Sequence, residues 1–383
     1  MLSANPKVKL TGMIYLDYNA TSPIKPAAKA ALVEAMDRCG NPSSVHRYGR
    51  IARRHLDEAR SSVAAMVGVK PSQVIFTSGG TEANILALRG IAAPQVIVSA
   101  IEHDSVLANA TAPQKLPVDE NGVVDLIAAA EILKNAPTGS LVSVMLVNNE
   151  TGVIQPIEEM AKLAKIYGHK IHTDAVQAAG RLAINFVSLG VDALSLSAHK
   201  IGGPQGVGAL IVDAKLALQA DHRGGGQEMN RRAGTENVAG IISFGVAAKL
   251  AADDLRDMPR LTAWRDELQQ KLTEIAGDDA VVLGADAPRV ANTLNIALCG
   301  VSSETQVAAL DLAAVAVSAG SACSSGKVKA SHVARAMGFG DDVAGSTLRI
   351  SLGWNTSAKD IERCVEAWRI FYERTHKNKS EAA

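Results

Sequence analysis

The sequence has no excess charge of either sign, few cysteines and no long apolar run. Its 39 basic side chains balance its 39 acidic ones, so the protein has no net electrostatic attraction to nucleic acid or to an anionic membrane. Four cysteines are too few for a disulfide framework and lack the paired spacing of a metal site. No stretch resembles a secretory signal or a membrane-spanning helix. A cytoplasmic protein without a nucleic-acid, membrane or metal partner is therefore expected.

The 383 residues, 47% of them hydrophobic, predict a large domain and a smaller one. Between about residues 73 and 212, short β-branched runs alternate with Ala/Leu-rich amphipathic ones; the short runs are QVIFTS, QVIVSA, LVSVMLV, KIHTD, DALSLSA and GALIV. This alternation predicts an α/β fold with a mostly parallel central sheet flanked by helices.

A second, smaller domain is expected in the C-terminal part of the chain. A long amphipathic helical stretch leads into it, and we expect an interruption of that stretch near Pro259. The strand-like runs ANTLNIAL and TLRISLGW follow, which predicts an α+β domain. We therefore assign residues 14–255 to the large domain, and 256–376 together with 1–13 to the small one.

Polar clusters follow five of the six short apolar runs directly. In chain order they are SGGTEAN, IEHDS, NNETG, AVQAAG and HKIGGPQG. Ligands of open α/β sheets bind outside the carboxyl ends of the strands, so these clusters are expected to converge on one cleft.

The segment IFTSGGTEAN reads as a strand, a glycine turn and a helix start. Such a helix start presents backbone N–H groups to an anion, and Thr81 would add a hydroxyl to the same phosphate site. A glycine turn that only joins strand to helix is equally compatible with the sequence. The segment matches neither the Walker A pattern nor the GxGxxG fingerprint, which disfavours a nucleotide site.

Lys200 and Asp174 each end an apolar strand, and together they indicate Schiff-base chemistry on a pyridine ring. Partial desolvation favours the neutral, nucleophilic lysine, and a carboxylate keeps a pyridinium nitrogen protonated so that the ring accepts electrons. Gln177 would reach the phenolic oxygen of that ring. Each assignment has an alternative: Lys200 as a solvent-facing lysine, and Asp174 as the cap of the next helix.

Four further side chains are candidates for the same cleft. His103 would stack on the ring or move protons near neutral pH, and Asn149 would hydrogen-bond the cofactor or substrate unless it only shapes a turn. Cys323 lies among small residues in SAGSACSSG, which suits an accessible thiol on a swinging loop. Arg349 would clamp a carboxylate, although a surface salt bridge is slightly favoured by its spacing alone.

Taken together, the segments resemble the cysteine desulfurases of the nitrogen-fixation and iron–sulfur-assembly type, among the class-V aminotransferases of fold type I. The matching segments are YLDYNATSP, NPSSVHRYG, FTSGGTEAN, EHDSV, NNETGVIQP, HTDAVQAAG, SLSAHKIGGPQGVGAL, RRAGTENVAG, SAGSACSSG and LRISLG. Their occurrence in this order along almost the whole chain is far more specific than any one of them.

The resemblance implies a role for each candidate residue toward pyridoxal 5'-phosphate. Lys200 would hold the cofactor as a Schiff base and remove the α-proton of L-cysteine, with Asp174, Gln177 and His103 around the ring. The phosphate would be held by Gly80, Thr81, Ser197 and His199, and by Thr235 from the opposite subunit of a homodimer. Asn149 and Arg349 would bind the substrate carboxylate. Cys323 would take the sulfur as a persulfide and pass it to an acceptor such as an iron–sulfur scaffold protein, leaving L-alanine.

Other functions remain open on the sequence alone. A selenocysteine lyase, a cysteine sulfinate desulfinase or a small-molecule aminotransferase would use the same fold and cofactor, and transamination needs no thiol at Cys323. A more distant alternative is a non-catalytic assembly subunit, and the most distant is a nucleotide-binding α/β protein.

Overall fold

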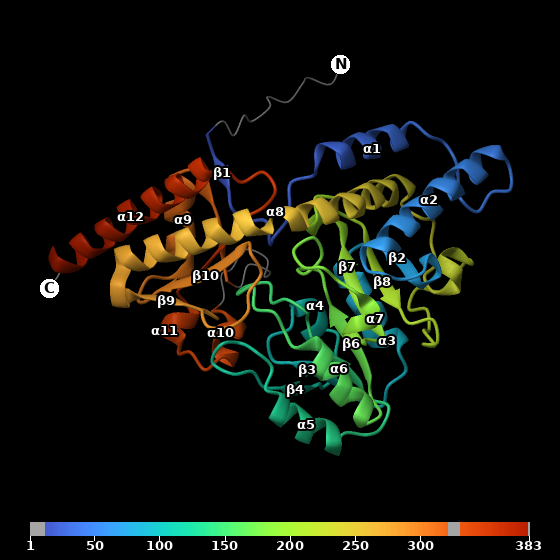
Figure 1. Ribbon diagram of the computed structural model, residues 1–383, viewed down its shortest axis with the longest axis horizontal. Coiled ribbons are helices and arrows are strands. Elements are labelled where there is room, and N and C mark those ends of the chain that lie inside the picture. Colours follow the sequence, from blue (N-terminus) through green and yellow to red (C-terminus); the bar gives the residue numbers. More distant parts are fainter. Residues whose placement is uncertain (1–11, 321–329, 382–383) are drawn as a thin grey trace.

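The short β-branched runs form one seven-stranded sheet in the computed structural model, which describes residues 12–320 and 330–381, with the backbone alone for 376–381 (Figure 1). Its spatial order is β2 (Val74–Thr77), β8 (Gly208–Val212), β7 (Ala193–Ser197), β6 (Lys170–Asp174), β5 (Leu141–Ser143), β3 (Val96–Ser99) and β4 (Gln114–Leu116). Strand β8 is antiparallel to both neighbours, and the other pairs are parallel. The predicted mostly parallel sheet is confirmed, and β4 is an addition that the sequence patterns did not predict.

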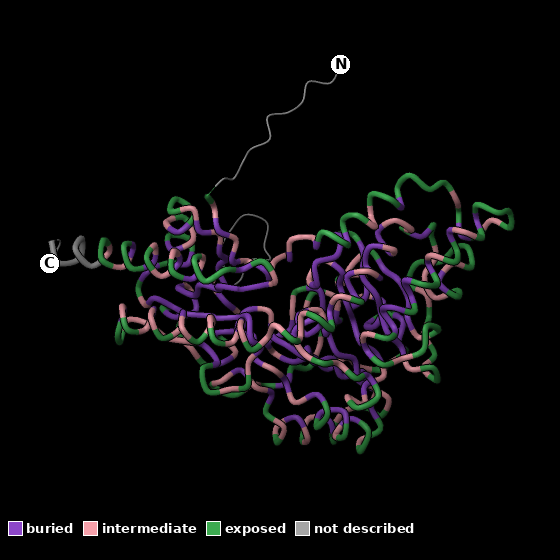
Figure 2. The backbone as a smooth tube through the Cα atoms, turned by 45° about the horizontal axis from the view of Figure 1, so that its top comes forward, coloured by how far each residue is buried: buried purple, intermediate pink, exposed green. Residues whose placement is uncertain are grey.

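Alternate residues of these strands enter two different cores, which explains their continuous apolar character. On β2, Val74 and Phe76 join one core while Ile75 joins the other, and β7 divides Leu194 and Ala193 in the same way. Both faces of a parallel sheet are covered by helices, so apolar residues predominate on both faces of its strands. In Figure 2 the strands are buried and the outer faces of the surrounding helices are exposed.

Helices cover both faces of this sheet. The first core receives side chains from α1 (Pro26–Met36), α2 (Arg47–Met66), α5 (Leu126–Asn135), α6 (Ile157–Ile166), α7 (Phe186–Leu189) and α8 (Val238–Ala276). The second receives them from α3 (Gly80–Gly90) and α4 (Asp104–Leu107). Four 3-10 turns are described as well: η1 (Pro71–Gln73), η2 (Ala198–Lys200), η3 (Gln227–Asn230) and η4 (Gly277–Asp279).

The C-terminal part forms a smaller antiparallel sheet with its own core. Its strand order is β12 (Ser318–Ala319), β13 (Thr347–Ser351), β10 (Thr293–Leu298) and β9 (Ala280–Val282). The helices here are α9 (Ser303–Leu312), α10 (His332–Ala336), α11 (Asp341–Ala344) and α12 (Ala358–Glu381). Trp368 is fully buried in this core.

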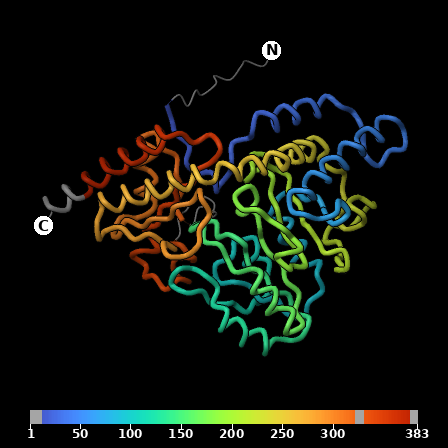
Figure 3. Tube along the Cα trace, in the orientation of Figure 1, coloured from blue at the N-terminus to red at the C-terminus, as the bar shows by residue number. Residues whose placement is uncertain are grey.

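The beginning of the described chain belongs to this smaller part. Strand β1 (Ile14–Tyr15) pairs in parallel with β11 (Val315–Ala316), so the beginning of the chain lies among its C-terminal elements (Figure 3). The chain then crosses to the large sheet. Residues 16–25 therefore run between the two parts, where the sequence alone gave no reason to place a functional side chain.

Helix α8 joins the two parts without the interruption expected near Pro259. It contacts α1 and α2 near its start and β9, β10 and α12 near its end. A proline removes one backbone donor and bends a helix, but it breaks the helix only where nothing else holds the next turns. Here Leu261, Leu268 and Leu272 follow it and are buried in the C-terminal core. Among the described residues, no helix combines the length and apolarity needed to cross a membrane.

Candidate active site

A cavity of about 200 Å³ lies at the carboxyl ends of the parallel strands. Nine of the residues predicted for the cofactor line it: Gly80, Thr81, His103, Asn149, Asp174, Gln177, Ser197, His199 and Lys200. They come from the segments after β2, β3, β5, β6 and β7, as expected for the clusters that follow these strands. The convergence of five polar clusters on one cleft is thereby confirmed.

Lys200 occupies the end of η2, immediately after β7, with its amine in the cavity wall. Its Nζ donates hydrogen bonds to the backbone carbonyls of Asn19 (2.5 Å) and Ala20 (2.9 Å). The carbonyl of Asn19 also accepts a 3.0 Å bond from Nε2 of Gln177. The structure therefore turns Lys200 toward the cavity, and the alternative of a solvent-facing lysine is wrong.

Asp174 ends β6 with 7% of its surface exposed, and its carboxylate accepts two different hydrogen bonds. Oδ1 accepts from the backbone N–H of Val176 (2.9 Å), and Oδ2 accepts from Nδ2 of Asn84 (2.7 Å). Residues 176–180 form turns rather than a helix, so the alternative that Asp174 caps a following helix is wrong; its bond to Val176 makes an Asx turn instead. Asn84 also donates to Oγ of Ser105 (2.9 Å) and so ties α3 to α4.

His103 is the N-cap of α4 and lines the same cavity. Its Nδ1 accepts a 3.0 Å bond from the backbone N–H of Ser105 and lies 2.8 Å from that residue's hydroxyl. In the neutral ring, this arrangement puts the imidazole proton on Nε2. A chain of hydrogen bonds through Ser105 and Asn84 thus connects the imidazole with the Asp174 carboxylate.

A fully buried carboxyl group precedes His103 in the chain. Oε1 of Glu102 accepts hydrogen bonds from Oγ of Ser99 (2.5 Å) and from the backbone N–H of Met145 (2.7 Å). Burial, with a smaller contribution from the nearby Asp174, raises the pKa of Glu102 to about 8, against the hydrogen bonds from Ser99 and Met145 that lower it. At neutral pH most of this carboxyl is therefore protonated, which limits the negative charge around the ring position.

One end of the cavity has the groups that a phosphate requires. Gly80 and Thr81 begin the 11-residue helix α3, whose first N–H groups have no intrahelical partner. The buried hydroxyl of Ser197 has no hydrogen-bond partner among the described residues. Burial, and then the neighbouring Lys200, lower the pKa of His199 to about 4, so its ring is neutral at neutral pH. An amine, a carboxylate and this anion site around one cavity fit pyridoxal phosphate.

Gln177 is held in one orientation by a buried arginine. Arg181 donates from Nη1 to both Oε1 and the backbone carbonyl of Gln177. Because its oxygen is occupied, the amide presents Nε2 toward Asn19 and the cavity. Burial lowers the pKa of Arg181 to about 9, and only a charge-assisted arrangement of this kind compensates for burying a guanidinium.

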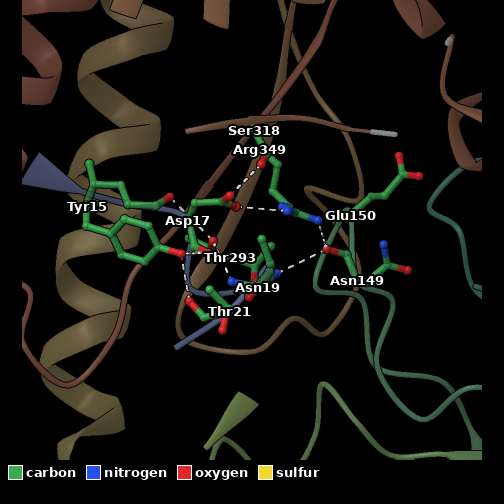
Figure 4. A network of polar contacts seen from close by, with 12 residues as sticks. Tyr15, Asp17, Asn19, Thr21, Asn149, Glu150, Thr293, Ser318 and Arg349 are labelled. Atoms are coloured by element: carbon green, nitrogen blue, oxygen red, sulfur yellow. Dashed lines mark hydrogen bonds and ion pairs between the residues drawn. The ribbon is translucent and has the colours of Figure 1, made fainter. Parts of the chain in front are cut away.

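Arg349 lies beside the cavity wall in the network of Figure 4. It is 2% exposed; Nη2 lies 2.9 Å from Oδ1 of Asp17, and Nη1 donates to the backbone carbonyl of Asn149 (3.1 Å). The surface salt bridge favoured from spacing is wrong, because this ion pair is buried between the two parts of the chain. The Nε–H of Arg349 is buried with no partner among the described residues, as expected of a donor aimed at a ligand.

Three predicted site residues do not line this cavity. Arg349 lies behind Asn149, whose backbone carbonyl it bonds, and is not a lining residue itself. Thr235 is exposed, and it is not part of the cavity lining of its own chain. Cys323 lies outside the described residues, so its placement stays a prediction. The described residues contain no cluster of three or more His, Cys, Asp or Glu side chains that suits a metal ion.

Sequence reasoning assigned no role to several polar residues of the site, among them Asn19, Asn84 and Glu102. Asn84 lies one helical turn after Thr81 on α3, and this spacing was a usable signal. Glu102 is adjacent to His103, but its burial was not readable from the sequence. Asn19 precedes every predicted strand of the large sheet, yet its side chain bonds Asn149 and, in the C-terminal part, Thr293. No local pattern indicates such a contact.

Comparison with known proteins identifies relatives over nearly the full chain. The chain matches the Aminotransferase class-V family over residues 14–364. It is 38% identical over 380 residues to the cysteine desulfurase IscS of Dictyoglomus turgidum, covering 94% of this chain and 95% of that protein. It is also 38% identical over 374 residues to an IscS-like cysteine desulfurase of Mycobacterium tuberculosis, covering 92% and 95%.

Solved structures give the same relationship. A NifS-like protein from Rickettsia africae has 36% sequence identity and a TM-score of 0.87, covering 94% of this chain and 99% of that one. The protein SspA, whose structure was determined in complex with cysteine, has 29% identity and a TM-score of 0.76, covering 88% and 98%.

Proposed function

This chain belongs to the Aminotransferase class-V family and is a pyridoxal phosphate-dependent cysteine desulfurase, and we propose how its residues take sulfur from L-cysteine. The single observation that carries the proposal is the placement of Lys200 and Asp174 in the wall of one cavity, together with seven other predicted residues. The products are L-alanine and a persulfide on the enzyme.

The cofactor would be held at three points. The start of α3 with Ser197 and His199 would bind the phosphate, Lys200 would hold the cofactor covalently, and Asp174 would keep a proton on the ring nitrogen. When bound, pyridoxal phosphate supplies an electron sink for the pair that the α-carbon of the substrate retains after losing its proton. Gln177, oriented by Arg181, would donate to the phenolic oxygen.

The substrate carboxylate would be bound by Arg349 and Asn149. The buried Nε–H of Arg349 has no partner within residues 12–320 and 330–375, and Asn149 lines the cavity. With the cofactor bound, the Lys200 amine would take the proton from the α-carbon of L-cysteine. His103 moves a proton at Nε2, since its Nδ1 is occupied by Ser105.

Cys323 would be the sulfur acceptor. Its thiolate attacks the substrate sulfur, a sulfur–sulfur bond forms, and the bond between the substrate β-carbon and sulfur breaks. The electron pair stays with the carbon skeleton, which is protonated and leaves as L-alanine. No oxidant is consumed, because the sulfur moves as a neutral atom onto the thiolate.

We also propose the assembly and the partners that the resemblance implies. Two copies would form a homodimer in which the exposed Thr235 of one reaches the phosphate site of the other. The Cys323 persulfide would pass its sulfur to an acceptor such as an iron–sulfur scaffold protein in the cytoplasm. The domain division at about residue 255 likewise stays a prediction.

A pair of substitutions tests the function. Purified protein is expected to show the visible absorption of pyridoxal phosphate bound to Lys200. Lys200→Ala is expected to remove both that absorption and the activity. Cys323→Ala is expected to keep the absorption but to lose alanine and sulfide formation from L-cysteine. Cys39→Ala removes an exposed thiol and serves as the control.

Sulfide release at the parent rate by Cys323→Ala would contradict the persulfide role. It would favour a reaction that needs no thiol, such as selenocysteine lysis, sulfinate removal or transamination. A colourless protein without visible absorption would instead favour the non-catalytic assembly subunit.

A further inference from the structure

A buried carboxyl group, that of Glu150, lies against chain segments on both sides of residues 321–329. Its Oε2 accepts a 2.5 Å hydrogen bond from Oγ of Ser331. The same oxygen lies 2.9 Å from the position that a Cβ on Gly320 would occupy, so the carboxyl packs directly on the Gly320 backbone. Glu150 is 2% exposed. One side chain therefore touches the residue before this segment and the second residue after it.

The backbone of Glu150 is fixed to the active-site wall. Its N–H donates to Oδ1 of Asn148 (2.9 Å), and its carbonyl accepts from Nδ2 of Asn295 (3.2 Å). The preceding residue, Asn149, lines the cofactor cavity. In Figure 4 the Glu150 side chain points away from the Arg349 guanidinium while Asn149 stays in the network around it. The carboxyl is thus a rigid extension of the cavity wall.

Ser331 connects the Glu150 carboxyl to the start of α10. It is the N-cap of that helix: Oγ accepts from the backbone N–H of Ala334 (3.0 Å) while donating to Glu150. The next residue, His332, has Nδ1 3.9 Å from Oε1 of Glu150 and Nε2 3.0 Å from the backbone carbonyl of Glu102. The start of α10 is therefore held against the strand ends that carry His103 and Asn149.

Gly320 leaves no room for a larger residue beside this carboxyl. A Cβ there would lie 2.4 Å from Oγ1 of Thr347 as well as 2.9 Å from Glu150. Burial raises the pKa of the Glu150 carboxyl, opposed by the Ser331 hydrogen bond and by the charges of His332 and Arg349. The Ser331 hydroxyl donates to either protonation form, so the contact does not depend on the charge of the carboxyl.

We propose that Glu150 is a positioning residue for sulfur transfer: its carboxyl fixes Gly320 and Ser331, the described residues beside the segment that carries Cys323, relative to the cofactor cavity. The inference rests on the proposed function, in which Cys323 receives the sulfur. Holding Gly320 and Ser331 in place would raise the effective concentration of the Cys323 thiol at the cofactor cavity. Loss of the anchor would slow sulfur transfer and leave the α-proton chemistry intact.

Two reactions of the same holoenzyme separate these effects. Formation of alanine and sulfide from L-cysteine requires the thiol of Cys323. Exchange of the α-proton of L-alanine with deuterated water requires the lysine and the cofactor, but no sulfur and no thiol. Glu150→Ala is expected to lower the first rate roughly 10- to 100-fold and to leave the second within about threefold of the parent.

A conservative variant and a matched control sharpen the test. Glu150→Gln keeps an acceptor oxygen for Ser331 and is expected to retain most of the sulfur-transfer rate. Ser331→Ala is expected to lower the sulfur-transfer rate while keeping the exchange rate. It replaces Glu150→Ala in the test if that variant does not fold. Ser302→Ala removes a comparable N-cap, on α9, where Oγ accepts from the N–H of Thr305 (3.2 Å); it is expected to leave both rates unchanged.

The proposal is overturned if Glu150→Ala and Ser331→Ala lower both rates equally, or if neither rate changes. In a Cys323→Ala background, Glu150→Ala is expected to have no further effect on sulfide release. If Cys323→Ala itself releases sulfide at the parent rate, the proposed function fails, and this outcome is distinct from failure of the Glu150 role.

Discussion

Arg349 forms a buried ion pair with Asp17, with Nη2 and Oδ1 2.9 Å apart, although 332 residues separate them in the chain. Oδ2 of Asp17 also accepts a 2.7 Å bond from Oγ of Ser318, which fixes the carboxylate. The guanidinium is therefore oriented before any substrate enters, and its Nε–H is kept for another acceptor. An arginine prepared in this way suits recognition of a carboxylate.

Arg349→Lys is expected to lower kcat/KM for L-cysteine roughly 10- to 100-fold, the equivalent of one charge-assisted hydrogen bond. A lysine ammonium is too compact to keep Asp17, the Asn149 carbonyl and a substrate carboxylate together. Steady-state kinetics measure the change, and retained visible absorption shows that the cofactor site is intact. Arg335→Lys alters an exposed ion pair with Asp341 and is the control. Equal kcat/KM for Arg349→Lys and the parent would refute the carboxylate role.

Gly80→Ala is expected to weaken cofactor binding by roughly tenfold. A Cβ at this position would lie 2.7 Å from Cγ2 of Val176 and 3.4 Å from Cβ of Ser197, so the wall of the phosphate end must move. Overpacking of this kind costs about 1–3 kcal/mol. Titration of the cofactor-free protein with pyridoxal phosphate, followed by absorbance, gives the affinity. Gly79→Ala meets open space and is expected to bind normally; a matching loss in both variants would argue against the phosphate site.

Glu102→Gln is expected to flatten the pH dependence of stability above pH 4.5. The folded-state pKa of about 8 lies above the ordinary value of 4.5, so between these values the folded protein binds more protons than the unfolded chain. Stability contributed by this group is then lost as the pH rises through that window, by at most about 1.4 kcal/mol per pH unit. Glutamine has no proton to lose.

Urea unfolding at pH 5.5, 7 and 8.5 measures this difference. The free energy of unfolding of the parent is expected to fall more steeply with pH than that of Glu102→Gln. Glu159→Gln, an exposed change in the first turn of α6, is the control and is expected to follow the parent. Parallel curves for parent and Glu102→Gln would show that the carboxyl is ionised in the folded protein throughout.

The apolar runs and the polar clusters that follow them predicted the large sheet and most of the cavity lining. A strand buried on both faces is mostly apolar, and polar residues at or just after its end lie at the carboxyl edge of the sheet. Asp174 at the end of KIHTD and His103 shortly after QVIVSA follow this rule, and both line the cavity. Periodicity and strand ends are local properties, so a linear pattern records them.

The tertiary structure alone decided which distant groups meet. A pattern states that a face is buried but not what it is buried against, so neither the pairing of Arg349 with Asp17 nor the contact of Glu150 with Ser331 was readable. The same holds for the continuity of α8 through Pro259, because the buried leucines after the proline stabilise the helix only once the C-terminal core has formed. Burial also set the protonation of Glu102, since desolvation depends on atoms brought close by folding.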